Sequence, residues 1–167
     1  YEVTFNEKWL RISKSLMDYL LINFFDENNK MFHFTSKKDE NLIARKYEVI
    51  DGVIPSSNSI IANSLFKLGH YYSNSSYLTI SEQMLNNVKE QVLTNPANYS
   101  NWLNLMTNFT KPFYEVVIAG KNAKELNKTL INRYLPNIII AGTTKENNEL
   151  PLLAYKFNEE GTLIYVC

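Results

Sequence analysis

The chain has 167 residues, of which 45% are hydrophobic and 13% aromatic, enough for a sizeable packed interior and too many for a disordered chain. Its 17 basic residues balance its 17 acidic ones, so it lacks the positive charge expected of a protein that binds nucleic acid or an anionic membrane. The single cysteine, Cys167, excludes a disulfide framework and favours a reducing, cytoplasmic location. From the balanced charge, we expect neither nucleic acid nor a membrane as a partner.

The first segment of the chain has the pattern of a wide amphipathic helix. Thr4 and Glu7 have the spacing of a capping box, which predicts a helix from there to about residue 25. Apolar side chains such as Trp9 and Leu16 cover roughly two-thirds of its circumference, so this helix should have neighbours on both flanks. A turn at 26–29 and a short strand at 30–35 are predicted to follow.

Three more helices are predicted before residue 111. The second covers about 58–72, the third carries apolar side chains from Tyr77 to Val92, and the fourth covers about 98–108. The breaks between these helices are short, which implies antiparallel neighbours. Residues 1–111 are thus predicted to form helical hairpins.

Residues 112–167 show a different pattern. Continuous apolar runs at 116–119 and 138–141 are typical of strands buried on both faces, and they bracket a predicted helix. This order predicts a βαβ unit, and residues 163–166 should add a third strand to a small, mostly parallel sheet. The expected fold class is mainly α, with this small α/β segment as a second unit.

The most informative stretch is 51–59, where turn-forming residues and four consecutive serine or asparagine side chains precede the second helix. Such side chains accept hydrogen bonds from the free amides of a helix start, so we expect a rigid polar corner. Asp51 is the candidate catalytic carboxylate, and Arg45 could pair with it and hold it ionised. Arg45, Ser56 and Asn58 are the candidate substrate-binding residues, although the same pairing would serve equally well as a structural clamp.

Other residues that could carry chemistry have a simpler structural interpretation. His33 and His70 could form an acid/base pair but are expected to have structural roles. The turn at Gly120 could hold an anion at a helix start, although it lacks a phosphate-loop spacing. Trp9 and Trp102 could stack on a sugar, with core packing as the default. We expect no metal site and no cofactor.

The sequence has five distinctive stretches, at 42–45, 51–59, 115–120, 135–137 and 165–167. Together they resemble the C-terminal part of a family of thioredoxin-domain-containing proteins of unknown function, which includes relatives of the spermatogenesis-associated thioredoxin-like protein. The resemblance implies an α/α toroid of the kind found in six-hairpin glycosidases and N-acylglucosamine 2-epimerases. This chain would then hold the last hairpins and the closing βαβ segment, and a thioredoxin-like domain would lie elsewhere in the parent chain.

Two functions follow as hypotheses, and whether the protein is an enzyme stays open. In the first, the toroid binds or modifies a carbohydrate-like small molecule, with Asp51, Arg45 and Asn58 at the end of the cavity. In the alternative, the chain is a non-catalytic interaction module that packs on the thioredoxin-like domain or on another partner. A third and weaker hypothesis places a nucleotide at the βαβ turn near Gly120.

Overall fold

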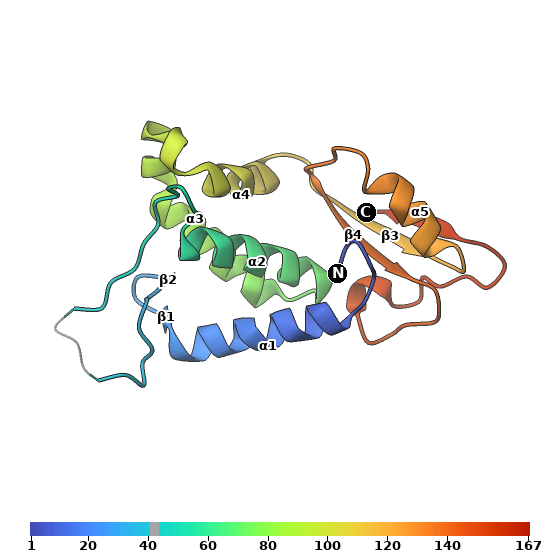
Figure 1. Ribbon diagram of the computed structural model, residues 1–167, viewed down its shortest axis with the longest axis horizontal. Helices are drawn as coiled ribbons and strands as arrows, with labels where there is room; N and C mark the ends of the chain where they lie inside the picture. Colours follow the sequence, from blue (N-terminus) through green and yellow to red (C-terminus); the bar gives the residue numbers. More distant parts are fainter. Residues whose placement is uncertain (41–43) are drawn as a thin grey trace.

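The computed structural model describes residues 1–40 and 44–167, so Leu42 and Ile43 lie outside the described residues. Helices α1 to α4 fill one half of the molecule, and a small sheet with helix α5 fills the other (Figure 1). The helices are α1 (Lys8–Asn23), α2 (Ser57–Tyr71), α3 (Ser75–Thr94), α4 (Ser100–Thr110) and α5 (Ala123–Leu130), with short 3-10 turns η1 (Pro96–Asn98) and η2 (Pro151–Leu153). The strands are β1 (Phe25–Asp26), β2 (Met31–Phe32), β3 (Tyr114–Ala119), β4 (Ile138–Thr143) and β5 (Leu163–Val166).

The mainly α class and the βαβ unit are confirmed, but the sheet is mixed. Strands β3 and β4 pair in parallel, whereas β5 pairs antiparallel on the other edge of β3, in the order β4-β3-β5. The expectation of a mostly parallel sheet was therefore wrong for the last strand. An apolar run carries no information about the direction of a strand, and in β5 it does not mark a buried strand either, because Leu163, Ile164 and Val166 are exposed.

Helix α1 begins later than the capping box predicted. The helix starts at Lys8, its N-cap Glu7 makes no side-chain cap, and Thr4 instead accepts a hydrogen bond from the amide of Asn6 at 3.3 Å. Phe5 has a φ of 55° and turns its ring into the core beside Ile118. The capping-box prediction was wrong because this buried aromatic contact takes precedence over the local cap.

Phe5 fits against β4 because Gly142 has no side chain. A Cβ at Gly142 would lie 2.2 Å from the Phe5 ring. The side-chain amide of Asn127 in α5 also donates to the carbonyl oxygen of Glu2 at 2.6 Å. The residues before α1 therefore anchor that helix to the α/β half of the molecule.

Helix α2 is the centre of the helical half. It packs closely on α3, where the Ser81 hydroxyl donates to the carbonyl of Ala62 at 2.8 Å. On another side it packs against α4, whose Trp102 is fully buried and donates through Nε1 to the carbonyl of Val49 at 2.8 Å. Core packing thus explains Trp102, one of the two tryptophans considered as sugar platforms.

Candidate functional site

The polar corner at 51–59 joins the starts of two helices. Ser56 is the N-cap of α2, and its hydroxyl oxygen accepts a hydrogen bond from the amide of Ser59 at 3.1 Å. The carboxylate of Asp51 accepts three further hydrogen bonds, from the amide of Ser56 at 3.0 Å, the hydroxyl of Ser59 at 2.6 Å and the amide of Asn101 at 2.9 Å. Because Asn101 lies in the first turn of α4, Asp51 holds the N-terminal ends of α2 and α4 together.

The ionisation of Asp51 follows from the same contacts. Burial disfavours the charged form, but the hydrogen bonds from Ser59, Ser56 and Asn101 outweigh it and lower the pKa of the carboxyl below its usual range. The partial positive charge of two helix N-termini acts in the same direction. Asp51 is thus a buried, ionised group whose lone pairs are directed at the chain itself.

Asn58 and Arg45 are directed away from Asp51. Asn58 is fully buried and bonds both the amide and the carbonyl of Phe32, at 2.8 and 3.0 Å, and the carbonyl of Glu48 at 3.0 Å. Arg45 donates to the backbone carbonyl of Thr35. The expected pairing of Arg45 with Asp51 was wrong, because the loop turns the guanidinium towards Thr35. Of the four candidate residues, the structure brings only Asp51 and Ser56 into direct contact.

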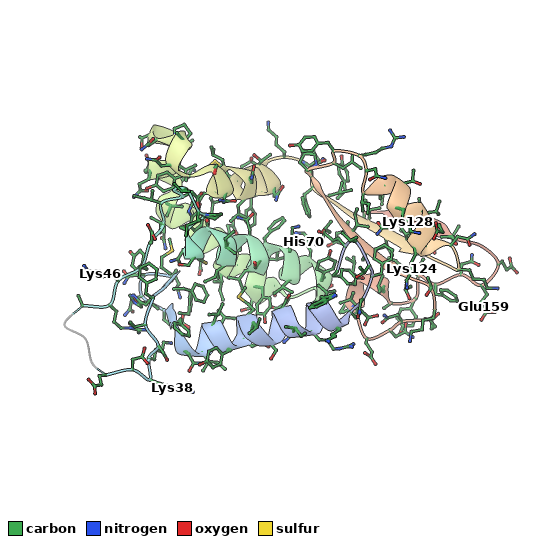
Figure 2. The ribbon with its side chains drawn as sticks, in the orientation of Figure 1. Lys38, Lys46, His70, Lys124, Lys128 and Glu159 are labelled. Atoms are coloured by element: carbon green, nitrogen blue, oxygen red, sulfur yellow. The ribbon has the colours of Figure 1, made fainter. Side chains whose placement is uncertain are left out.

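The two histidines pair with carboxylates in different parts of the fold and do not form an acid/base pair with each other. His33 lies 3.1 Å from Asp26 through Nε2, next to the β1–β2 turn. Asp26 has its pKa lowered to about 2, chiefly by the amide of Asn28, although burial opposes this. His70 at the far end of α2 lies 2.8 Å from Glu115 of β3, and Figure 2 shows it where the two halves of the molecule meet.

The turn after β3 is covered by the chain itself. Gly120 has a φ of 138°, and a Cβ there would lie 2.3 Å from the carbonyl oxygen of Gly161. The amide of Asn122, at the start of α5, donates to the hydroxyl of Thr162 at 2.9 Å. The segment that contains Thr162 therefore lies where an anion would bind at the start of α5. It already accepts a hydrogen bond from one of the amides that the anion would need.

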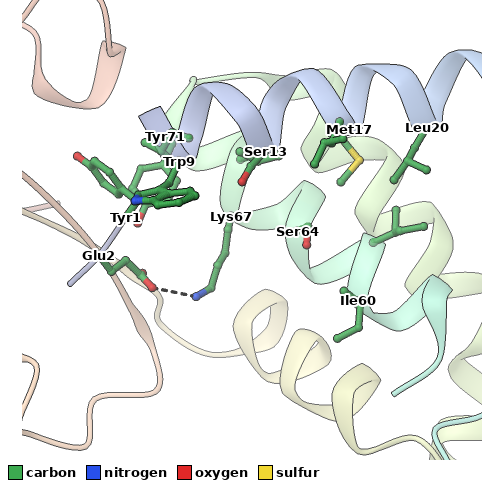
Figure 3. A pocket seen from close by; sticks show the side chains of 14 residues that line it. Tyr1, Glu2, Trp9, Ser13, Met17, Leu20, Ile60, Ser64, Lys67 and Tyr71 are labelled. Atoms are coloured by element: carbon green, nitrogen blue, oxygen red, sulfur yellow. Dashed lines mark hydrogen bonds and ion pairs between the residues drawn. The ribbon is translucent and has the colours of Figure 1, made fainter. Parts of the chain in front are cut away.

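An open apolar groove of about 360 Å³ lies between α1 and α2 (Figure 3). Trp9 and Leu16 of α1 form one wall, and Ile60 of α2 lies on the other. At one end, Lys67 Nζ lies 3.2 Å from Glu2 Oε2. Residues Ser13 and Ser64 contribute the hydroxyls, and Tyr1 and Tyr71 the other aromatic rings.

The outward side of α1 continues this apolar surface. We call its four side chains the outer stripe: Trp9 is 51% exposed, Ile12 41%, Leu16 59% and Tyr19 51%. Successive members lie three, four and three residues apart, which places them within an arc of about 80° on the helix. Leu10 and Met17 also line the groove, but they are buried against the rest of the helical half. The helix has apolar residues on two flanks, as the sequence predicted, and the residues that the structure describes cover only one of them.

Sequence reasoning did not find the polar end of the groove. Glu2 and Lys67 are 65 residues apart, and nothing in the sequence joins them. Trp9 was a candidate sugar platform with core packing as the default, and the structure places it half-exposed at the groove. The one local signal for the groove was the unusual width of the apolar face of α1.

A comparison of the chain with protein-family models finds no match, and neither does a comparison with curated proteins. Within residues 1–40 and 44–167, no group of three or more histidine, cysteine, aspartate or glutamate side chains is placed to hold a metal ion. None of the helices in these same ranges has both the length and the apolar character needed to cross a membrane.

Proposed function

We propose that this chain is a non-catalytic interaction module that binds an amphipathic helix along α1. The observation that carries the proposal is the outer stripe, where four large apolar side chains between 41% and 59% exposed lie in one row beside an open groove. Soluble proteins rarely leave a continuous apolar surface of this kind uncovered unless it binds something.

The geometry of the stripe favours a helix as the bound element. The spacing of Trp9, Ile12, Leu16 and Tyr19 is that of the a and d positions of a coiled-coil seam, into which a second helix packs its own side chains. The stripe itself contains no charged residue, and small hydroxyl side chains at Ser13 and Ser15 flank its centre. A helix with a matching apolar face can therefore approach α1 closely.

The resemblance to thioredoxin-domain-containing proteins supports this proposal. One hypothesis drawn from that resemblance is an interaction module that packs on another partner, and the uncovered flank of α1 has the apolar character that such packing requires. The hydrogen bonds of the polar corner at 51–59 also support the proposal. Three donors of the chain already occupy the Asp51 carboxylate, so its function is to hold α2 and α4.

Helix binding can be tested through the fluorescence of Trp9. A synthetic amphipathic helix of about three heptads, with leucine at its a and d positions, would be titrated into the protein. We expect a saturable shift of Trp9 emission to shorter wavelength, because Trp102 is already buried and cannot contribute it. The shift should be lost in Leu16→Lys and kept in Leu93→Lys, a helical leucine of the same 59% exposure. The absence of a saturable shift in the unmodified protein would contradict the proposal.

A second candidate function is binding of a carbohydrate-like molecule in the groove. Trp9 offers a half-exposed ring, and the groove also holds the hydroxyls of Ser13 and Ser64 beside the ion pair of Lys67 and Glu2. An aromatic face with nearby polar groups suits a pyranose ring. Titration with N-acetylglucosamine should then change Trp9 emission, and Lys67→Met should weaken this response. No change at millimolar sugar would remove this candidate.

A further inference from the structure

The outer stripe has the same order when it is read from either end. Its side chains run aromatic, aliphatic, aliphatic, aromatic, from Trp9 through Ile12 and Leu16 to Tyr19. The intervals of three, four and three residues are symmetric as well. A surface with this property can pair with a copy of itself around a two-fold axis.

We propose that α1 pairs antiparallel with α1 of a second copy of this chain. The inference rests on the proposed function, because it names the helix that covers the outer stripe. In this arrangement Trp9 lies opposite Tyr19 of the partner subunit, and Ile12 lies opposite Leu16 of the partner subunit. The two-fold axis passes near the middle of the stripe.

Small residues lie where the two helices approach most closely. Ser13 and Ser15 are exposed and stand on either side of the centre of the stripe. The axes of packed helices lie about 8–10 Å apart, and the side chains at the contact set the separation within this range. Neither serine has a bulk that would hold the two helices apart.

Charge distinguishes the antiparallel arrangement from the parallel one. Lys14 pairs with Asp18 at 2.7 Å and Arg11 lies 3.8 Å from Glu7, so the charges on the far flank of α1 are neutralised within the chain. Lys8, whose ammonium lies 5.7 Å from the centre of the Trp9 ring, is next to one end of the stripe. A parallel pair would bring the two Lys8 side chains together, whereas an antiparallel pair places each of them at the opposite end of the seam.

The exposed area of the stripe is sufficient for a weak, specific dimer. Four side chains of this size and exposure present on the order of 500 Å² of apolar surface on each copy, against about 800 Å² per partner in a standard interface. Further contacts at the groove edge, where Ile60 is 46% exposed, add to this area. The expected dissociation constant is in the micromolar range.

Sedimentation velocity over a range of concentrations tests whether the pair forms. The unmodified chain should change from the monomer mass to twice that mass as its concentration rises through the micromolar range. Leu16→Lys should weaken association at least tenfold, because it places a charge in an apolar seam, and Leu93→Lys should behave as the unmodified chain. A monomer at all concentrations would overturn the inference. Retained binding of the synthetic helix under those conditions would leave the proposed function intact, and loss of both would reject both.

Disulfide formation tests the direction of the pair. In a Cys167→Ser background, Trp9→Cys and Tyr19→Cys chains would be oxidised separately and as a mixture. The antiparallel arrangement predicts an intermolecular disulfide in the mixture that neither chain forms alone. Disulfides in each separate chain, with none joining the two in the mixture, would show a parallel pair and overturn the arrangement. Failure of all three samples to cross-link, in chains that still sediment as dimers, would overturn the assignment of the contact to α1.

Discussion

The Asp51 corner and the outer stripe of α1 use their side chains in opposite ways. The corner is polar, yet Asp51 and Asn58 are buried and bonded to the backbone of the same chain. The stripe is apolar, yet Trp9 and Leu16 are more than half exposed. The polar Asp51 corner therefore stabilises the fold. The outer stripe has an apolar pattern that is typical of core residues, yet it is exposed and free to bind.

This difference has a simple physical basis. A buried hydrogen-bonding group costs free energy unless it is paired, so the corner keeps its shape only because its groups are paired with each other. The exposure of large apolar side chains to water costs free energy, and burial removes this cost. Nothing within the described residues covers the outer stripe. The predictions below separate stability from binding by changing one region at a time.

The largest loss of stability is expected for Asn58→Ala. This substitution leaves the amide and carbonyl of Phe32 and the carbonyl of Glu48 without partners in a buried site. The free energy of unfolding should fall by about 4 kcal/mol, measured by urea denaturation. Asn104→Ala, on the exposed side of α4, is the control and should change it by less than about 0.5 kcal/mol. Equal effects of the two substitutions would mean that Asn58 does not hold β2 and the following loop.

The next largest loss is expected for Asp51→Ala, because three buried donors lose their acceptor. The free energy of unfolding should fall by about 3 kcal/mol, measured by urea denaturation.

The contribution of the negative charge is tested with Asp51→Asn. The folded-state pKa of Asp51 is below its ordinary value, so its ionisation stabilises the fold above the unfolded pKa of about 4. The unmodified protein should thus have a higher free energy of unfolding than Asp51→Asn. This difference should be largest at neutral pH and should shrink as the pH falls below about 4. A difference that stays constant down to pH 2 would refute an ionised Asp51.

A moderate loss is expected for Gly142→Ala, which adds a Cβ 2.2 Å from the Phe5 ring. Displacing this ring should lower the free energy of unfolding by about 2 kcal/mol. Gly161→Ala is the matched control, since a Cβ at Gly161 meets nothing within 4 Å. Thermal unfolding of both variants measures the difference. No difference between them would mean that Phe5 does not fix the start of α1 on the sheet.

The smallest change in stability is expected for Leu16→Lys. Because Leu16 is 59% exposed, its replacement should change the free energy of unfolding by less than about 0.5 kcal/mol, as should Leu93→Lys. Chemical denaturation at low protein concentration, where any dimer is dissociated, measures this. A loss above about 2 kcal/mol in Leu16→Lys alone would place Leu16 in the core and remove the outer stripe as a free surface.

Much of the fold could be predicted from the sequence because local chemistry determines it. Ser56 places the start of α2 at Ser57, one residue from the prediction of 58, and the apolar runs located β3 and β4. What the sequence did not predict depends on contacts between distant residues. Phe5 leaves the predicted first helix in order to pack beside Gly142, and β5 runs against the direction of β3.

The candidate site shows the same limit. The sequence predicted correctly that 51–59 forms a hydrogen-bonded polar corner at the start of a helix, because capping and turn residues act on their neighbours. It did not reveal that the amide of Asn101, 50 residues away, donates the third hydrogen bond to the Asp51 carboxylate. Arg45 was paired with Asp51 on sequence proximity alone, and the geometry of the loop directs it to Thr35 instead.

The central claim is that the outer stripe binds a helix and the corner stabilises the fold. It is tested most directly by attaching a fluorescent label to the synthetic amphipathic helix and titrating two variants of the protein into it in parallel. The fluorescence anisotropy of that peptide should show at least tenfold weaker binding to Leu16→Lys. Binding to Asp51→Asn should equal that of the unmodified protein at a temperature where this variant is still folded. The reverse result, with binding lost in Asp51→Asn and kept in Leu16→Lys, would contradict the account.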